Sequence, residues 1–140
     1  ENSHVIPGMI YRFHEAKINN LPSVTIWGTG TPKREFLYVD DLAKASIDLM
    51  NIDKKIYDEH ISSMCSHINV GSSLDLTIKE LAEAVREVVG FSGKIKFDLT
   101  KPDGTSRKFL DSKRINNFGF KPQISLKNGL IKTYQDYIKI

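Results

Sequence analysis

The 140-residue sequence has very little cysteine and no long apolar run. Its single cysteine, Cys65, cannot form a disulfide within the chain and belongs to no zinc-binding pattern. A disulfide scaffold and a cysteine-based metal site are therefore excluded, no metal site is predicted, and a reducing, cytoplasmic location is favoured. No stretch approaches the roughly 20 apolar residues of a membrane-spanning helix, and the first residues lack the pattern of a signal peptide, so no membrane partner is expected.

An excess of charge of one sign is also missing. The chain has 20 Lys and Arg against 17 Asp and Glu, a formal net charge of +3, and acids and bases alternate along it. Binding to nucleic acid is therefore not expected, whereas a small anionic ligand is compatible with this balance. The sequence also begins without Met directly before an apolar segment of helical period, so we expect it to be part of a longer protein.

With 40% apolar residues, the chain is typical of one ordinary globular domain. Thr77 and Glu80 fit a capping box, and the apolar stripe that follows them stops at Gly90. The 40–50 helix is expected to start on a cap at Asp40 or Asp41 and to be well buried. Helices are expected over residues 5–19, 40–50, 78–89, 111–118 and 126–137, and strands over 24–27, 35–39, 67–71 and 94–98. This alternation predicts an α/β or α+β unit with a small sheet, some of whose strands complete a sheet that lies outside the chain.

Two glycines, Gly28 and Gly30, superficially resemble a phosphate-binding loop. A dinucleotide fingerprint needs a third glycine that opens a helix, but here Pro32 and an extended run follow, so we expect a hairpin turn. The chain also has no Walker A sequence, no His-Glu-x-x-His motif and no Tyr-x-x-x-Lys pair. It therefore contains no complete redox machinery.

Cationic and aromatic side chains occur together in one set: Arg12, Trp27, Arg34 and the basic residues of the 101–108 loop. Guanidinium groups suit phosphate oxygens and an indole face suits a flat base or a sugar, so these residues can bind a sugar nucleotide. The alternative, which spacing alone favours, is that the two arginines are surface or structural ion-pair residues and the tryptophan belongs to the core. His4 lies just before a helix, where an imidazole can donate or accept a proton, but a lone histidine at such a position is more often a polar cap.

Six strings carry a family resemblance, in the same order and spacing: Ser3-His4-Val5-Ile6-Pro7, Phe13-His14-Glu15-Ala16, Trp27-Gly28-Thr29-Gly30-Thr31-Pro32, Arg34-Glu35-Phe36-Leu37-Tyr38-Val39-Asp40-Asp41, His67-Ile68-Asn69-Val70-Gly71 and Lys101-Pro102-Asp103-Gly104. Together they resemble the C-terminal portion of the GDP-L-fucose synthase family. That family belongs to the extended short-chain dehydrogenase/reductases.

The resemblance implies an α/β fold, with residues 1–140 as a C-terminal substrate-binding region. Segments 36–50 and 67–70 would pack on an N-terminal Rossmann domain that is absent from this chain and that binds most of the NADP(H). The family converts GDP-4-keto-6-deoxy-D-mannose to GDP-L-fucose by 3,5-epimerisation and NADPH-dependent reduction of the 4-keto group. The full-length enzyme would be a homodimer, and the 140-residue chain alone is expected to be inactive.

The family's substrate contacts carry over onto five residues: Arg12, Trp27, Arg34, Asp103 and Lys108. His4 matches the histidine that acts as a catalytic acid and lies near the cofactor, whereas Cys65 does not match the family's catalytic cysteine. Two alternatives stay open: another NDP-sugar epimerase or reductase of the extended family, and a non-catalytic module that binds sugar nucleotides.

Overall fold

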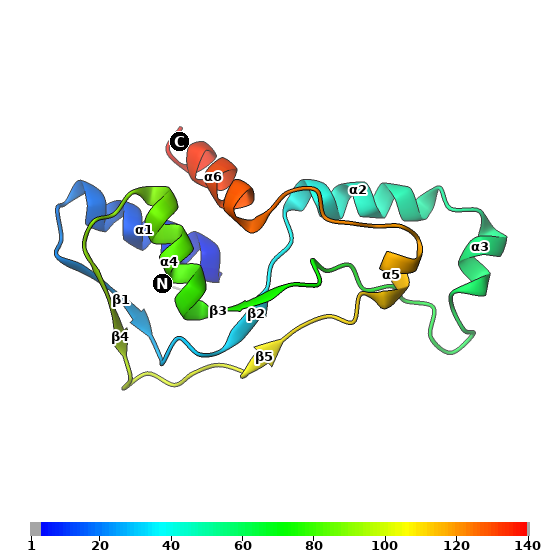
Figure 1. Cartoon of the computed structure of the whole chain (residues 1–140), viewed down its shortest axis with the longest axis horizontal. Coiled ribbons are helices and arrows are strands. Elements are labelled where there is room, and N and C mark those ends of the chain that lie inside the picture. Colours follow the sequence, from blue (N-terminus) through cyan, green and yellow to red (C-terminus); the bar gives the residue numbers. More distant parts are fainter. Residues whose placement is uncertain (1–3, 140) are drawn as a thin grey trace. The chain divides into compact units, whose positions relative to one another are not determined.

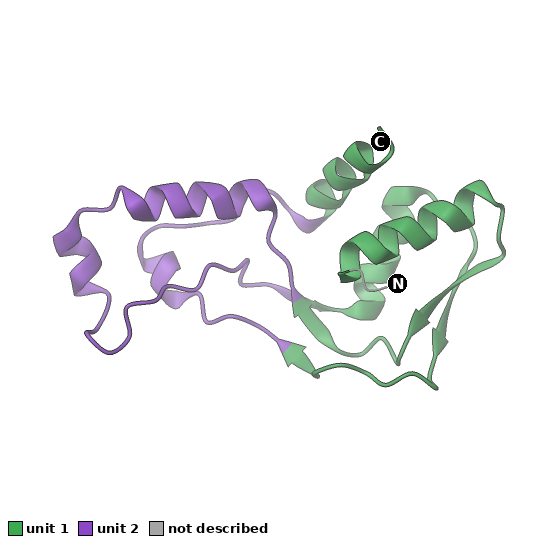
Figure 2. Ribbon diagram, turned by 180° about the vertical axis from the view of Figure 1, so that it is seen from behind, with its two compact units in different colours: residues 1–34, 76–107, 127–140 green, residues 35–75, 108–126 purple. Residues whose placement is uncertain are grey.

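The computed structural model describes residues 4–139, which form two compact units. The first unit takes the chain up to residue 34, residues 76–107 and the chain from 127 onward, and the second takes residues 35–75 and 108–126 (Figure 2). Residues 1–3 and 140 belong to the predicted 1–140 region but lie outside the described residues. Ser3, the first residue of the strings that carry the resemblance, is among them.

Two parallel strands and three helices make up most of the first unit (Figure 1). Strands β1 (Ser23–Trp27) and β4 (Lys94–Asp98) pair in register, from Ser23 opposite Lys94 to Trp27 opposite Asp98. Helix α1 (Val5–Ile18) packs on α4 (Ile78–Val89), and α6 (Leu126–Tyr137) completes the unit. The buried apolar side chains of the unit are Met9, Ile10, Phe13, Ala16, Val24, Ile26, Leu81, Ala82, Val85, Val89, Phe91 and Leu130.

Helix α4 is set by its two ends. The Thr77 hydroxyl accepts a hydrogen bond from the Glu80 amide at 3.1 Å, and the Glu80 carboxylate accepts one from the Thr77 amide at 2.7 Å. Gly90 ends the helix in the left-handed conformation, at φ +72°, which glycine adopts without a steric penalty. The predicted capping box and stop are therefore confirmed, as are α1, α6, β1 and β4.

The second unit contains α2 (Val39–Met50), α3 (Lys54–Glu59) and α5 (Lys113–Asn117). The prediction that an aspartate caps α2 is wrong, because the helix begins after Tyr38 and both aspartates lie in its first turn. Asp41 is only 3% exposed, and its carboxylate accepts hydrogen bonds from the amides of Gln123 and Ile124, both at 3.0 Å. Its role is therefore to hold the chain before α6.

Most of the apolar side chains of α2 are not covered by the described chain. Val39 is 65% exposed, Ile47 60% and Met50 84%, and Leu42 is also exposed. The expectation of a well-buried helix is therefore wrong for this chain, in which only Asp41 and Ala45 of α2 are buried.

Two of the predicted strands differ from the structure. The extended run after Arg34 is shorter and earlier than expected, since β2 covers Lys33–Glu35 and α2 already starts at Val39. Residues 67–71 form no strand in the described structure, because they find no ladder partner there. Two short strands not predicted, β3 (Asp75–Thr77) and β5 (Arg107–Lys108), form a sheet with the order β3-β2-β5.

The prediction of a hairpin turn at Gly28 to Pro32 is also wrong. β1 pairs with β4 and β2 belongs to the other sheet, so the turn connects two sheets. In α6, Leu130 is buried, whereas Ile138, which follows the helix, is exposed.

Glu35 links three segments of the second unit. One carboxylate oxygen accepts from the Ser73 amide at 2.7 Å and the other from the Leu110 amide at 2.9 Å. The approach is close at Gly71, where an added Cβ would lie 2.5 Å from the carboxylate. These contacts therefore require two acceptor oxygens on residue 35 and a residue without a side chain at position 71.

Glu35→Gln is expected to destabilise the chain by about 2 kcal/mol, because an amide replaces one of the two acceptors with a donor and leaves a backbone N–H without a partner. Urea unfolding followed by circular dichroism measures the change, with Glu59→Gln on the exposed end of α3 as the matched control. Equal stability of the two variants would contradict this role for Glu35.

No helix within residues 4–139 is long and apolar enough to cross a membrane.

Candidate functional site

A cavity of about 1390 Å³ opens in the first unit. Its walls come from the first turns of α1, the end of β1, the turn that follows it, the loop after β4 and the last turns of α6. Four of the predicted substrate contacts line it: Arg12, Trp27, Arg34 and Asp103. The structure therefore brings together side chains that lie up to 91 residues apart in the sequence.

Both arginines are anchored through backbone carbonyls. Arg12 on α1 donates from Nε to the Gly8 carbonyl at 3.1 Å and from Nη1 to the Thr25 carbonyl at 3.4 Å. Arg34 on β2 donates from Nη1 to the Lys33 carbonyl at 2.6 Å. Within residues 4–139 neither guanidinium forms an ion pair with a carboxylate. The alternative of structural ion pairs is therefore wrong, and both groups keep donors for an anion.

Trp27, at the end of β1, is 63% exposed and lines the cavity. The alternative that it belongs to the core is therefore wrong. The Lys101 ammonium lies 5.5 Å from the centroid of its ring system, which is within the range of a cation–π contact. The rim at the tryptophan thus carries a further positive charge.

Asp103 is the acidic residue of the cavity lining. One of its carboxylate oxygens accepts from the Thr29 amide at 2.9 Å, and the other accepts from the Thr29 hydroxyl at 2.6 Å. The described lining therefore combines two guanidinium groups with one carboxylate, a positive balance suited to an anion.

The remaining two predicted residues are placed differently. His4 is the exposed N-cap residue of α1, directly before Val5 of the cavity wall, but its side chain makes no capping hydrogen bond, so the alternative of a polar cap is wrong. Lys108 belongs to the second unit and does not line this cavity. The roles of both residues remain predictions.

Sequence reasoning missed Thr133 and Tyr137 of α6, which also line the cavity. Their spacing of four residues places them on one face of the helix, and this was the available signal. The helix is fastened to α1 where His14 Nδ1 lies 3.0 Å from the Tyr134 hydroxyl oxygen and the two rings pack edge to face. Burial, together with the neighbouring Tyr137, raises the pKa of Tyr134, so its phenol stays neutral near pH 7.

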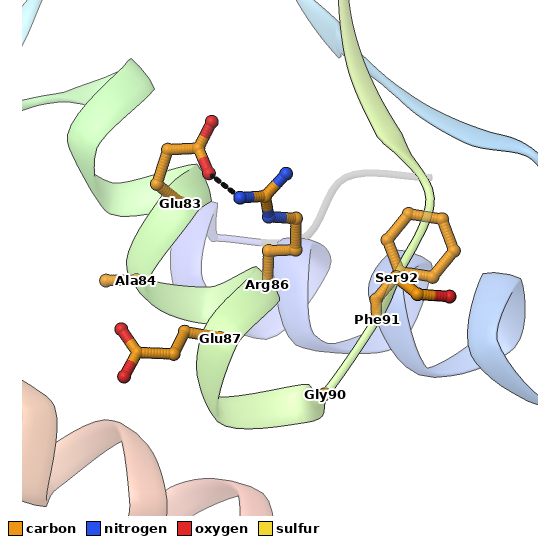
Figure 3. A pocket seen from close by; sticks show the side chains of 7 residues that line it. All are labelled: Glu83, Ala84, Arg86, Glu87, Gly90, Phe91 and Ser92. Carbon is orange, nitrogen blue, oxygen red and sulfur yellow. Dashed lines mark ion pairs between the residues drawn. The ribbon is translucent and has the colours of Figure 1, made fainter.

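A smaller pocket of about 580 Å³ lies at the end of α4 and is drawn in Figure 3. Its charged residues have partners: Arg86 contacts the Glu83 carboxylate at 2.7 Å, and Glu87 contacts Lys127 of α6 at 2.6 Å. A hydrogen bond from Lys127 and its charge lower the pKa of Glu87. The pocket offers no spare charge, so the larger cavity is the candidate site.

Within residues 4–139 no group of three or more His, Cys, Asp or Glu side chains is arranged to hold a metal ion. The two glycines that resemble a phosphate loop also serve internal packing. A Cβ at Gly28 would lie 2.2 Å from the Asp103 carboxylate and one at Gly30 would lie 2.5 Å from the Phe97 ring. The described residues therefore do not fit a dinucleotide loop.

The chain is similar to several curated proteins along nearly its whole length. It is 55% identical over 139 residues to "Probable GDP-L-fucose synthase 1" of Oryza sativa subsp. japonica and 51% identical over 138 residues to "GDP-L-fucose synthase" of Escherichia coli (strain K12). These matches cover 99% of the chain but only 40% and 43% of the two relatives. The chain thus spans about two fifths of their length.

Solved structures show the same fold. The GDP-mannoheptose C4 reductase of Campylobacter jejuni, determined with NADP bound, matches 99% of the chain and 46% of its own length, with a TM-score of 0.81 and 37% identity. A UDP-glucose 4-epimerase from Thermotoga maritima matches 99% of the chain and 40% of its own length, with a TM-score of 0.77 and 21% identity, and so supports the fold alone. The predicted α/β class, a partial chain of the extended short-chain dehydrogenase/reductase fold, is confirmed.

The sequence profile of the "NAD dependent epimerase/dehydratase family" matches residues 1–71, which is just over half of the chain. These residues include α1, β1 and β2, the elements that carry Arg12, Trp27 and Arg34 into the cavity. The chain therefore belongs to the NAD dependent epimerase/dehydratase family.

Proposed function

We propose that this chain supplies the GDP-sugar-binding part of a GDP-L-fucose synthase. The observation that carries the proposal is the single cavity in which two guanidinium groups without carboxylate partners lie with an exposed indole. Ligand pockets usually measure about 300–1,000 Å³, so the cavity of about 1390 Å³ has room for a nucleotide sugar.

In this proposal the two phosphates of the ligand, with a charge of about −2, accept hydrogen bonds from Arg12 and Arg34. Lys108 is proposed as a further substrate-binding cation, on the resemblance alone. Trp27 forms an apolar wall for a ring, and Asp103 accepts a hydrogen bond from a hydroxyl or from a base N–H.

The proposed reaction begins with epimerisation. The 4-keto group of the substrate acidifies C3 and C5, so an acid and a base can invert both centres through enolates. His4 is proposed as the acid, because it matches the histidine that has this role in the family it resembles. Reduction at C4 would use a hydride from NADPH held by residues outside this chain.

Segments 36–50 and 67–70 are proposed to pack on that nucleotide-binding part. The exposed apolar side chains of α2 support this, since Val39, Ile47 and Met50 lie on one helix without cover in the described chain and exposed apolar surface of this kind can mark an interaction site. Without that partner, and without a Tyr-x-x-x-Lys pair, the chain alone is not expected to reduce a substrate.

The nucleotide preference tests the proposal. Titration calorimetry of the 140-residue chain with GDP, UDP and dTDP is expected to give the tightest binding for GDP, by about tenfold, because guanine offers two N–H donors to a carboxylate acceptor where uracil and thymine offer one. Tighter binding of UDP would instead indicate an enzyme for another NDP-sugar.

A second candidate is a GDP-sugar reductase that does not epimerise. The resemblance to solved heptose reductases, such as the GDP-mannoheptose C4 reductase at 37% identity, favours it. The two candidates differ in whether C3 and C5 of the sugar exchange their hydrogens with solvent. When the full-length protein reacts in deuterium oxide, epimerisation incorporates deuterium at both positions, whereas simple reduction leaves both unlabelled.

A further inference from the structure

In the turn between β1 and β2, one residue, Thr29, hydrogen-bonds to the loop after β4. Its amide donates to one Asp103 carboxylate oxygen at 2.9 Å and its hydroxyl donates to the other at 2.6 Å. Gly28, at φ +78°, makes this approach possible, because a Cβ there would lie 2.2 Å from the same carboxylate. The contact joins residues that lie 74 positions apart in the sequence.

The protons of this contact have one consistent arrangement. An ionised carboxylate only accepts, so the single hydroxyl proton of Thr29 must point to Asp103. The Thr31 hydroxyl, whose oxygen lies 2.7 Å from that of Thr29, must then donate to it, and the Thr31 amide also donates to the same oxygen at 3.2 Å. A directed chain therefore runs from Thr31 through Thr29 to the carboxylate.

This contact fastens the 101–104 loop at the cavity. At one end of the loop, the Lys101 ammonium lies 5.5 Å from the Trp27 ring centroid. At the other end, an added Cβ on Gly104 would lie 3.2 Å from Arg34 Nη2, so the loop backbone runs directly against the guanidinium. All of these loop residues are exposed, and Asp103 is the residue whose side chain ties the loop to the turn.

We propose that Thr29, oriented by Thr31, is a positioning residue for ligand binding in this cavity. It fixes the Asp103 carboxylate in one orientation, with two of its roughly four acceptor positions filled and the other two available to a ligand. It also holds the 101–104 loop in place before the ligand arrives, which avoids the cost of ordering that loop on binding. The identity of the ligand, a GDP-sugar, rests on the proposed function.

The test is a mutant cycle on the 140-residue chain, with GDP as the probe and titration calorimetry as the measurement. Thr29→Val keeps the shape and the amide but loses the hydroxyl, and it is expected to weaken GDP binding about tenfold. Thr29→Ser restores the hydroxyl and is expected to bind within about twofold of the wild type. In an Asp103→Ala background, Thr29→Val is expected to have no further effect, because Thr29 acts through that carboxylate.

Thr105→Val is the matched control, because this threonine is exposed, directly follows the 101–104 loop and has no hydrogen-bond partner for its hydroxyl within residues 4–139. It is expected to bind GDP as the wild type does. Wild-type affinity in Thr29→Val, combined with weakened binding in Asp103→Ala, would overturn the positioning role. So would additive losses in the double variant.

A wild-type chain that does not bind GDP would contradict the proposed function instead. Amide hydrogen exchange then tests the Thr29–Asp103 contact, on which the positioning role depends, without any ligand. Exchange of the Thr29 amide about tenfold faster in Asp103→Ala than in the wild type supports the contact, and equal exchange rates overturn it.

Discussion

Replacing Arg34 with alanine is expected to weaken GDP binding about 100-fold. The guanidinium lines the cavity without a carboxylate partner, so its charge is available to the diphosphate. Hydrogen bonds to charged groups contribute about 1.5–3 kcal/mol, and 2.7 kcal/mol corresponds to about 100-fold. Arg34→Lys keeps the charge but loses the planar fork of donors, so an intermediate loss of about tenfold is expected.

Titration calorimetry measures this effect, and Arg86→Ala provides the control. Arg86 lies in the same unit but pairs with Glu83 in the smaller pocket (Figure 3). Its removal is expected to leave GDP affinity within about twofold, because its charge is already compensated. An equal loss in both variants would show that net charge, and not this cavity, attracts the nucleotide.

Phe13→Ala is expected to destabilise the first unit by about 4 kcal/mol, from the lost transfer of a buried ring and the cavity left behind. Phe13 is 0% exposed and packs edge to face on Phe91, with ring centroids 5.7 Å apart. It thereby holds α1, the helix that carries Arg12, against the rest of the unit.

Urea unfolding followed by circular dichroism measures the loss. Ile18→Ala, at the exposed end of the same helix, is expected to change the free energy of unfolding by less than about 0.5 kcal/mol. A loss below about 1 kcal/mol for Phe13→Ala would mean that the packing of α1 is not as described.

Helices with local signals could be predicted from the sequence. The capping box at Thr77 and the stop at Gly90 fix α4 without reference to any other segment, and the same holds for the apolar period of α1. Strands depend on partners elsewhere, and this is why residues 67–71 form no strand in the described chain. The prediction that α2 is well buried was wrong for a related reason, because the described chain does not cover most of the helix's apolar side chains.

The candidate site was predictable only in part. The resemblance selected five substrate contacts, of which four lie on one cavity, whereas Lys108 does not line it. From spacing alone, ion-paired arginines and a buried tryptophan stayed possible, because local sequence does not determine the ion-pair partners or the exposure of a side chain. The hydrogen bonds from Thr29 to Asp103 could not be predicted either, because they join residues 74 positions apart in the sequence.

A crystal structure of the chain grown with GDP would test the central claim most directly. The diphosphate is expected within hydrogen-bond reach of both guanidinium groups, Arg12 and Arg34, with a ring of the nucleotide against Trp27. GDP bound outside this cavity, with neither guanidinium in contact with a phosphate, would contradict the account.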